Sequence, residues 1–106
     1  MCAGELETLV RLDLPITLVV IANAVYGWIK AGQKTAYAQR YFSVDFGVTD
    51  HARVAQAFGV SAWRVTEPAK LAGALREALA HRGPTLVDIV CQPLHEARAP
   101  VSEWVA

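Results

Sequence analysis

The sequence predicts an α/β domain: a mostly parallel β-sheet with helices on both faces, in three layers. Three observations lead to this prediction. Helical and strand-like segments alternate along the 106 residues, which is typical of parallel sheets. The segments 16–21 and 85–90 are apolar runs with little polar alternation, as expected for strands that are covered on both faces. The apolar fraction is 54%, so nearly every element is buried or part of the surface meets another domain or subunit.

The first half of the chain predicts a helix, a strand, and a loop that contains a short helix. Apolar residues recur at three- and four-residue intervals in the helix, and Pro15 prevents its continuation. The strand ends near Asn23–Gly27, whereas the aromatic residues of the loop follow no sustained period. These segments are residues 2–13, residues 16–21 and residues 31–46.

The second half predicts two helices that alternate with two strands. Thr49 or Asp50 is suited to cap the first helix, and Gly59 to end it. Thr66 is expected to cap the second helix, with Pro68 in its first turn, where a missing N–H costs nothing. These segments are a helix that runs through Phe58, a strand at 61–65, a helix with a stripe of Leu71, Leu75 and Leu79, and a strand at 85–90.

Several charged residues require a partner or solvent. Asp88 lies inside an apolar strand, so Arg64 or Arg76 is expected to pair with it. His51 is expected in a first helical turn, in contact with water. Three basic residues before the second half form either a solvated face or a patch for a phosphate or carboxylate substrate: Lys30, Lys34 and Arg40.

Charge and composition exclude several classes of function. Ten basic residues balance ten acidic ones and no basic run occurs, so no nucleic-acid partner is expected. The longest apolar run, residues 16–22, is too short to span a bilayer, so no membrane partner is expected. No secretory signal is recognised, which predicts a cytoplasmic protein with Cys2 and Cys91 reduced. The histidines and cysteines show no metal-ligand spacing.

The candidate site is the segment Asn23–Trp28, which follows the first strand. In an open α/β sheet, ligands bind outside the carboxyl ends of the strands. The amide oxygen of Asn23 and a nearby backbone carbonyl suit a hard cation, and Gly27 permits a tight turn or a close approach to a ligand. An ordinary strand-to-helix turn, with Asn as a turn residue, is the alternative.

Several short motifs, in order and spacing, resemble the thiamine diphosphate-dependent enzymes of the acetolactate synthase and 2-oxoacid decarboxylase type, which include benzoylformate decarboxylase. The resemblance covers residues 4–92 and corresponds to the second half of the diphosphate-binding (PP) domain. It predicts a partial domain at residues 1–92 and a C-terminal tail at residues 93–106. The motifs are Glu5-Leu6-Glu7-Thr8, Leu14-Pro15-Ile16, Asn23 with Gly27, Asp45-Phe46, Ala55-Gln56-Ala57-Phe58-Gly59, and Gly83-Pro84-Thr85 through Asp88.

This resemblance implies thiamine diphosphate and Mg²⁺ as cofactors. In the family, the Asp of a Gly-Asp-Gly turn and a later Asn bind the Mg²⁺ that holds the diphosphate. By position, Asn23 would ligate Mg²⁺ through its side chain and Val25 through its backbone carbonyl. Tyr26, Gly27 and Trp28 would line the diphosphate and thiazolium side of the cleft. The implied reaction makes or cleaves a carbon–carbon bond next to the carbonyl of a small 2-oxoacid, with the cofactor as electron sink.

The sequence departs from the family pattern at three points. Neither the Gly-Asp-Gly turn nor the pyrimidine-binding domain that supplies the activating Glu is among these residues. The chain is therefore expected to form an incomplete fold and to be inactive alone. Ala22 stands where the family's Asn pair begins. Gly32 stands where acetohydroxyacid synthases have a Trp, which argues against branched-chain amino-acid synthesis and leaves decarboxylase, lyase and acetyltransferase relatives open.

Two alternatives remain besides a fragment of an enzyme. One is a non-catalytic α/β module of the same fold that binds a partner chain. The other is an unrelated nucleotide-binding domain, although no phosphate loop is found. Whether the chain is part of an enzyme or such a module, the apolar strand at 16–21 or the one at 85–90 is expected at an unprotected sheet edge. Because such an edge pairs readily with another chain, a homo-oligomer is predicted.

Overall fold

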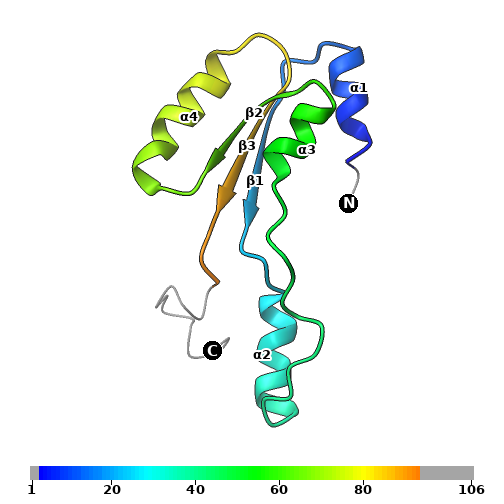
Figure 1. Ribbon diagram of the computed structural model, residues 1–106, viewed down its shortest axis with the longest axis vertical. Helices are drawn as coiled ribbons and strands as arrows, with labels where there is room; N and C mark the ends of the chain where they lie inside the picture. The colour runs from blue at the N-terminus through cyan, green and yellow to red at the C-terminus, as the bar shows by residue number, and fades with distance from the viewer. Residues whose placement is uncertain (1–2, 94–106) are drawn as a thin grey trace. The chain divides into compact units, whose positions relative to one another are not determined.

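The computed structural model describes residues 3–93, which fall into two compact units. Among these residues, the sheet unit comprises residues 3–22 and 50–90, and the turn unit comprises residues 23–49 and 91–93. No helix within residues 3–93 is long and apolar enough to cross a membrane. The elements are α1 (Glu5–Arg11), β1 (Thr17–Ala22), α2 (Gly27–Ala36), α3 (His51–Ala57), β2 (Ser61–Val65), α4 (Pro68–Ala80) and β3 (Thr85–Val90) (Figure 1).

Three parallel strands form the sheet of the sheet unit, in the order β1-β3-β2 (Figure 1). Thr17 of β1 and Ser61 of β2 both pair with Thr85 of β3. The strands therefore run in register and their carboxyl ends reach the same edge. One of the two apolar strands was expected at a sheet edge: β1 does lie at an edge of the described sheet, whereas β3 is its central strand.

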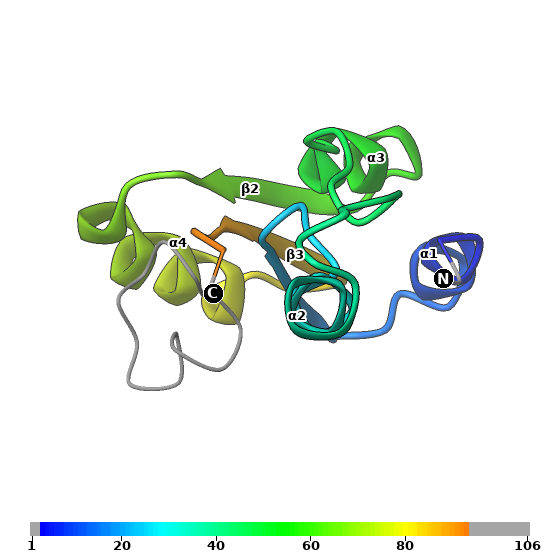
Figure 2. The ribbon, with the colours of Figure 1, turned by 90° about the horizontal axis from the view of Figure 1, so that it is seen from below.

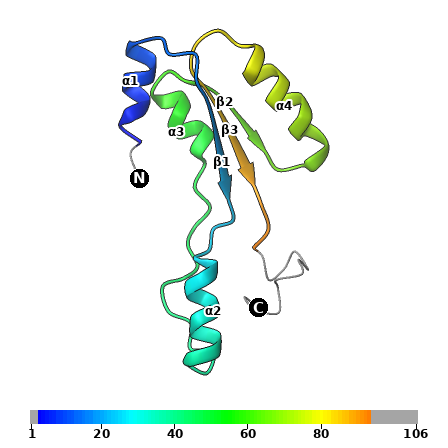
Figure 3. The ribbon, with the colours of Figure 1, turned by 180° about the vertical axis from the view of Figure 1, so that it is seen from behind.

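Helices cover both faces of this sheet, which confirms the predicted α/β class. Figure 2 shows α3 and α4 on opposite sides of the strands, and Figure 3 shows the same layers from behind. Leu86 and Val87 of β3 point to opposite faces. The core under α1 and α3 contains Leu6, Ala55, Val60 and Leu86. The core under α4 contains Val65, Ala78 and Val87.

The ends of the elements agree with the sequence prediction where local chemistry sets them. Asp50 is the N-cap of α3 and accepts the backbone N–H of Arg53 at 2.9 Å. Gly59 follows this helix in the left-handed conformation, with φ 91°. β1, β2 and β3 lie within one residue of the predicted strands. α1 is shorter than predicted, because Asp13 is also left-handed and cannot continue a helix; Cys2 lies outside the described residues.

Three expectations about the helices are wrong. Glu67, not Thr66, is the N-cap of α4, and it makes no side-chain capping bond. Leu79 is 71% exposed, and Ala78 takes the buried position instead. A helix turns once every 3.6 residues, so the stripe through Leu71 and Leu75 drifts off the sheet by the next turn. α2 begins at Gly27, before the segment in which a short helix was expected.

Asp88 is a fully buried carboxylate that joins three elements at the carboxyl end of the sheet. It accepts the backbone N–H of His51 at 3.1 Å, and the His51 Nδ1 lies 3.1 Å from its other oxygen. Arg64 Nη1 lies 3.6 Å from Asp88 and 3.2 Å from Asp50. Arg64 is therefore confirmed as the partner of Asp88, whereas the expectation that His51 meets only water is wrong.

The hydrogen bond from the backbone N–H of Arg53 lowers the pKa of Asp50. The guanidinium of Arg64 lowers this pKa further, while partial burial opposes both effects. A carboxyl group whose pKa is lower in the folded state stabilises the fold above its unfolded pKa. That stabilisation is lost as the pH falls through the folded pKa.

We therefore expect Asp50→Asn to unfold at lower urea concentration than the wild type at neutral pH. Asn still caps a helix, so this difference reports the charge. It should disappear as the pH falls through the folded pKa of Asp50, whereas Asp50→Ala, which loses the cap as well, should remain less stable at every pH. Urea unfolding followed by circular dichroism measures this. A gap between wild type and Asp50→Asn that does not change with pH would show that the charge contributes nothing.

Candidate functional site

The predicted site residues Asn23–Trp28 lie in one turn that leads from the end of β1 into α2. Asn23 Oδ1 accepts the backbone N–H of Val25 at 3.3 Å. Ala24 between them has the left-handed conformation, with φ 54°, which is uncommon for a residue with a Cβ atom. Asn23 is thus a turn residue, and its amide oxygen keeps a second lone pair for another partner.

Segment 44–46 returns beside this turn and fixes the direction of the Val25 peptide groups. Val25 and Asp45 form an antiparallel bridge. Two backbone hydrogen bonds flank the pair: Tyr26 N–H to the Val44 carbonyl at 2.8 Å, and Phe46 N–H to the Ala24 carbonyl at 3.1 Å. In a bridge of this kind, the N–H and C=O of the paired residues themselves point outward. The carbonyl of Val25 is therefore directed away from segment 44–46.

The first turn of α2 offers backbone N–H groups that its own chain does not use. Tyr26 is the N-cap without a side-chain capping bond, and the first turn has no acidic residue. The amides of Gly27, Trp28 and Ile29 have no acceptor among residues 3–93. Such a helix end carries partial positive charge and suits an anion such as a phosphate.

Gly27 and Trp28 leave room beside this helix end. A Cβ atom at Gly27 would meet nothing within 4 Å, and its φ is not left-handed, so this chain alone does not require glycine there. The space is open to a ligand. Trp28 is 79% exposed, and Tyr26 is half exposed, with its ring centroid 4.8 Å from that of Phe46. The rings are therefore accessible to a ligand or to another surface.

The oxygen donors in this turn fit part of a magnesium shell. The side chain of Asn23 and the carbonyl of Val25 are neutral, hard oxygens of the kind that Mg²⁺ binds, together with carboxylates, phosphates and water. Among the described residues, no group of three or more His, Cys, Asp or Glu side chains is placed to hold a metal ion. The turn therefore offers two oxygens of this kind and no negative charge of its own.

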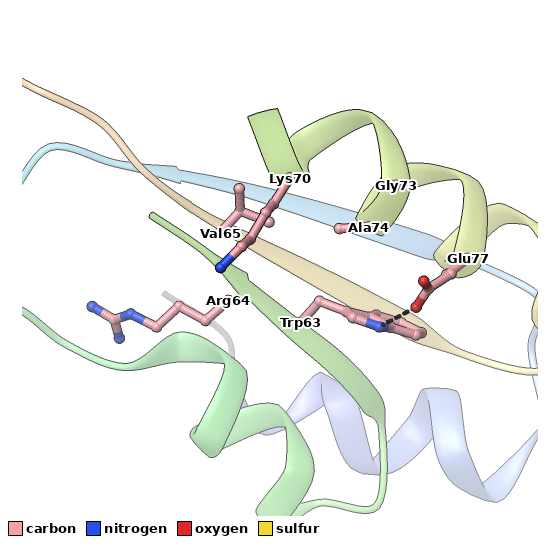
Figure 4. Close-up of a pocket in the computed structure, with 7 residues that line it drawn as sticks. All are labelled: Trp63, Arg64, Val65, Lys70, Gly73, Ala74 and Glu77. Atoms are coloured by element: carbon pink, nitrogen blue, oxygen red, sulfur yellow. Dashed lines mark hydrogen bonds between the residues drawn. The ribbon is translucent and has the colours of Figure 1, made fainter. Parts of the chain in front are cut away.

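A second candidate is an open groove of about 360 Å³ between β2 and α4 (Figure 4). Two of its polar side chains already have partners: Trp63 Nε1 donates to Glu77 at 3.0 Å, and Lys70 Nζ lies 2.7 Å from Glu67, which does not line the groove. Figure 4 shows the Arg64 side chain directed away from Trp63. The groove therefore has fewer uncommitted groups than the turn. Its lining residues are Trp63, Arg64, Val65, Lys70, Gly73, Ala74 and Glu77.

Sequence reasoning did not connect Lys30 and Asp45 with the site. Lys30 was expected on a solvated face or in a patch with Lys34 and Arg40, but its Nζ lies 2.8 Å from Asp45 and 5.3 Å from the centroid of the Tyr41 ring. Asp45 was noticed only as part of a motif. The pair spans fifteen positions across a helix and an irregular segment, so no periodic pattern signals it.

Comparison with known proteins identifies relatives. Acetolactate synthase of Bacillus subtilis is 38% identical over 87 residues, which cover 82% of this chain and 15% of that protein. The probable acetolactate synthase large subunit of Methanocaldococcus jannaschii is 32% identical over 94 residues (88% and 16%). The acetolactate synthase large subunit of Porphyra purpurea is 32% identical over 90 residues (83% and 15%). The chain thus spans 15–16% of the length of these relatives.

The family profile of the thiamine pyrophosphate enzyme, C-terminal TPP binding domain, matches residues 1–89. This range contains the Asn23–Trp28 turn and nearly all of the described sheet. The resemblance that the sequence motifs indicated is confirmed at the level of the family. The chain belongs to the thiamine pyrophosphate enzymes, through their C-terminal TPP-binding domain.

Proposed function

We propose that this chain supplies the part of a thiamine diphosphate site that anchors the Mg²⁺–diphosphate group. The enzyme would make or cleave a carbon–carbon bond next to the carbonyl of a small 2-oxoacid. One observation carries the proposal: the Asn23–Trp28 turn brings two oxygen donors next to a helix end with unused N–H groups. The acetolactate synthase relatives support the 2-oxoacid class of substrate.

Each residue of the turn has a distinct role in this proposal. Asn23 and Val25 hold Mg²⁺ through the side-chain and backbone oxygens. The amides of Gly27 and Trp28, with the partial charge of α2, bind the diphosphate, and the rings of Tyr26 and Trp28 line the cleft. Bound thiamine diphosphate supplies the electron sink for the reaction at the carbonyl carbon. The chain contributes binding and orientation.

The small number of oxygen ligands that the turn offers to Mg²⁺ also supports the proposal that these 106 residues do not catalyse by themselves. Two neutral oxygens leave the charge of Mg²⁺ uncompensated, and the nearby carboxylate of Asp45 is already paired with Lys30. Mg²⁺ sites in proteins commonly include one or two carboxylates. A carboxylate ligand must therefore come from a segment other than this turn.

We also propose that the chain self-associates through β1. This strand lies at an edge of the described sheet and contains no charged residue, no proline and no bulge, the features that normally protect an edge. Val19 and Ile21 are exposed apolar residues on the same face of it. The chain has no net charge to keep copies apart.

The first expected outcome concerns activity. The purified chain, given thiamine diphosphate, Mg²⁺ and pyruvate, should release no acetolactate or CO₂ above the rate without protein, because the site lacks a charged metal ligand. Coupled assays for both products measure this. Turnover by a preparation from a host that lacks acetolactate synthase would contradict the expectation.

The second expected outcome concerns Asn23. It is tested in a chimera in which residues 1–89 replace the matching segment of the Bacillus subtilis acetolactate synthase. Asn23→Ala should weaken thiamine diphosphate binding at limiting Mg²⁺ by about tenfold to a hundredfold, the typical loss for a metal-site partner. Asn23→Asp keeps the oxygen and the turn, so it should bind at least as tightly as the wild type. Isothermal titration calorimetry measures both affinities, and sedimentation confirms that each chimera assembles.

An Asn23→Ala chimera with unchanged affinity at limiting Mg²⁺ would refute the role of Asn23 as a ligand. Saturating Mg²⁺ provides the internal control. If the side chain acts through the metal, the deficit shrinks as Mg²⁺ rises; a deficit that stays constant would assign Asn23 to the shape of the turn alone.

The third concerns association. At micromolar concentration the wild-type chain should sediment as a homo-oligomer, and Val19→Lys should sediment near the monomer mass of 11.5 kDa, because a charge on an edge strand prevents strand pairing. Leu79→Lys, which changes an exposed apolar residue on α4, is the matched control and should leave the oligomer intact. A wild-type chain that is monomeric under these conditions would overturn the proposal.

A further inference from the structure

Two side chains of α2 form polar contacts with the segment that follows the helix. Lys30 and Gln33 are three residues apart, so they lie on the same face of the helix. Lys30 Nζ contacts both carboxylate oxygens of Asp45, at 2.8 Å and 3.1 Å. The Gln33 side chain donates to the Phe42 carbonyl at 3.0 Å and accepts the Phe42 N–H at 2.8 Å. Segment 42–46 therefore cannot slide along α2 without breaking these bonds.

Asp45 links these contacts of α2 to the Asn23–Trp28 turn. Its side chain binds Lys30 on α2, and its main chain forms the antiparallel bridge with Val25. The turn needs such a restraint, because Ala24 is held in a left-handed conformation that a residue with a Cβ atom rarely adopts. Only one apolar side chain of α2, Ala31, is buried, so packing contributes little to holding the helix in place.

The surroundings of Lys30 strengthen the ion pair relative to an ordinary surface pair. The Lys30 side chain is 20% exposed, and the Tyr41 ring lies beneath its ammonium group. Asp45 remains 61% exposed, so solvent still screens the attraction. The Lys70–Glu67 pair has a similar distance of 2.7 Å but is largely exposed on both sides, which makes it a matched reference.

We propose that the Lys30–Asp45 ion pair positions the Asn23–Trp28 turn. In the conformation that this pair holds, the Val25 carbonyl is directed away from segment 44–46 and the first amides of α2 are left without an acceptor. Both residues act through the turn and not on the ligand itself. The identity of the ligand rests on the proposed function. The restraint on the turn is independent of that function and is tested without any ligand.

The test is amide hydrogen exchange in the 106-residue chain, followed by NMR. The amides of Tyr26 and Phe46 form the bonds that flank the Val25–Asp45 pair, so they report opening of the turn. Asp45→Asn and Lys30→Met should each raise their exchange rates about two- to fivefold, the range expected for a partly exposed ion pair. Exchanging the charges, Lys30→Asp with Asp45→Lys, should return the rates toward wild type. Glu67→Gln should leave them unchanged.

Salt provides a second arm of the same experiment. Rising ionic strength should accelerate these two amides in the wild type and have little effect in Asp45→Asn, where no ion pair remains to be screened. Unchanged exchange in both Asp45→Asn and Lys30→Met would overturn the proposal. Equal acceleration of the Leu86 and Val87 amides in the central strand would also overturn it, since that shows loss of the whole fold. If the restraint is found but Asn23→Ala binds cofactor normally, the proposed function fails and the positioning role stands.

Discussion

The buried carboxylate of Asp88 is the constraint on which the carboxyl end of the sheet depends. A fully buried charge is costly unless it is paired and hydrogen-bonded, and Asp88 meets this requirement with groups from two other elements. The backbone and ring of His51 bind it from the start of α3, and Arg64 binds it from β2. Arg64 also reaches Asp50, the N-cap of α3. One carboxylate thus ties the start of α3 and the end of β2 to the C-terminal half of β3, near the edge where ligands bind in open α/β sheets.

The two units are held together internally by different interactions. The sheet unit has apolar cores on both faces of a three-stranded sheet, and its shape follows from burial, which does not depend on direction. The turn unit buries few apolar side chains and relies on directed bonds: the Asn23 turn, the Val25–Asp45 bridge, and the contacts of Lys30 and Gln33. This division suits a binding site, because directed bonds determine where individual oxygens and amides point, whereas packing alone does not.

The parts of the fold that local chemistry determines could be predicted from the sequence. Asp50 and Gly59 mark the ends of α3 through capping and a left-handed backbone, and the apolar runs mark β1 and β3. The start of α2 was placed poorly because its N-cap, Tyr26, makes no side-chain capping bond and its first turn has no acidic residue, so the sequence has no local signal for a helix start there. The partner of Asp88 was found from the rule that buried charges are paired, but the part played by His51 depends on how α3 meets β3, which no local pattern shows.

The candidate site, too, could be predicted from the sequence only where local residues define it. Asn23 and Gly27 were located by their position after a strand and by the family motif, and the structure adds the direction of the Val25 carbonyl and the unused amides of α2. These features arise from the return of segment 44–46. That return depends on contacts between residues far apart in sequence, so it could not be derived from spacing.

In the proposed site, the turn at residues 23–28 holds the metal and the diphosphate. Paramagnetic Mn²⁺, a substitute for Mg²⁺, broadens the NMR signals of amides near it, so a titration of the labelled chain with Mn²⁺ and thiamine diphosphate tests the claim directly. We expect the amides of residues 23–29 to broaden first, and to broaden more with thiamine diphosphate present than with Mn²⁺ alone. Broadening centred on the β2–α4 groove or on the Asp50 and Asp88 carboxylates, with the turn unaffected, would contradict it.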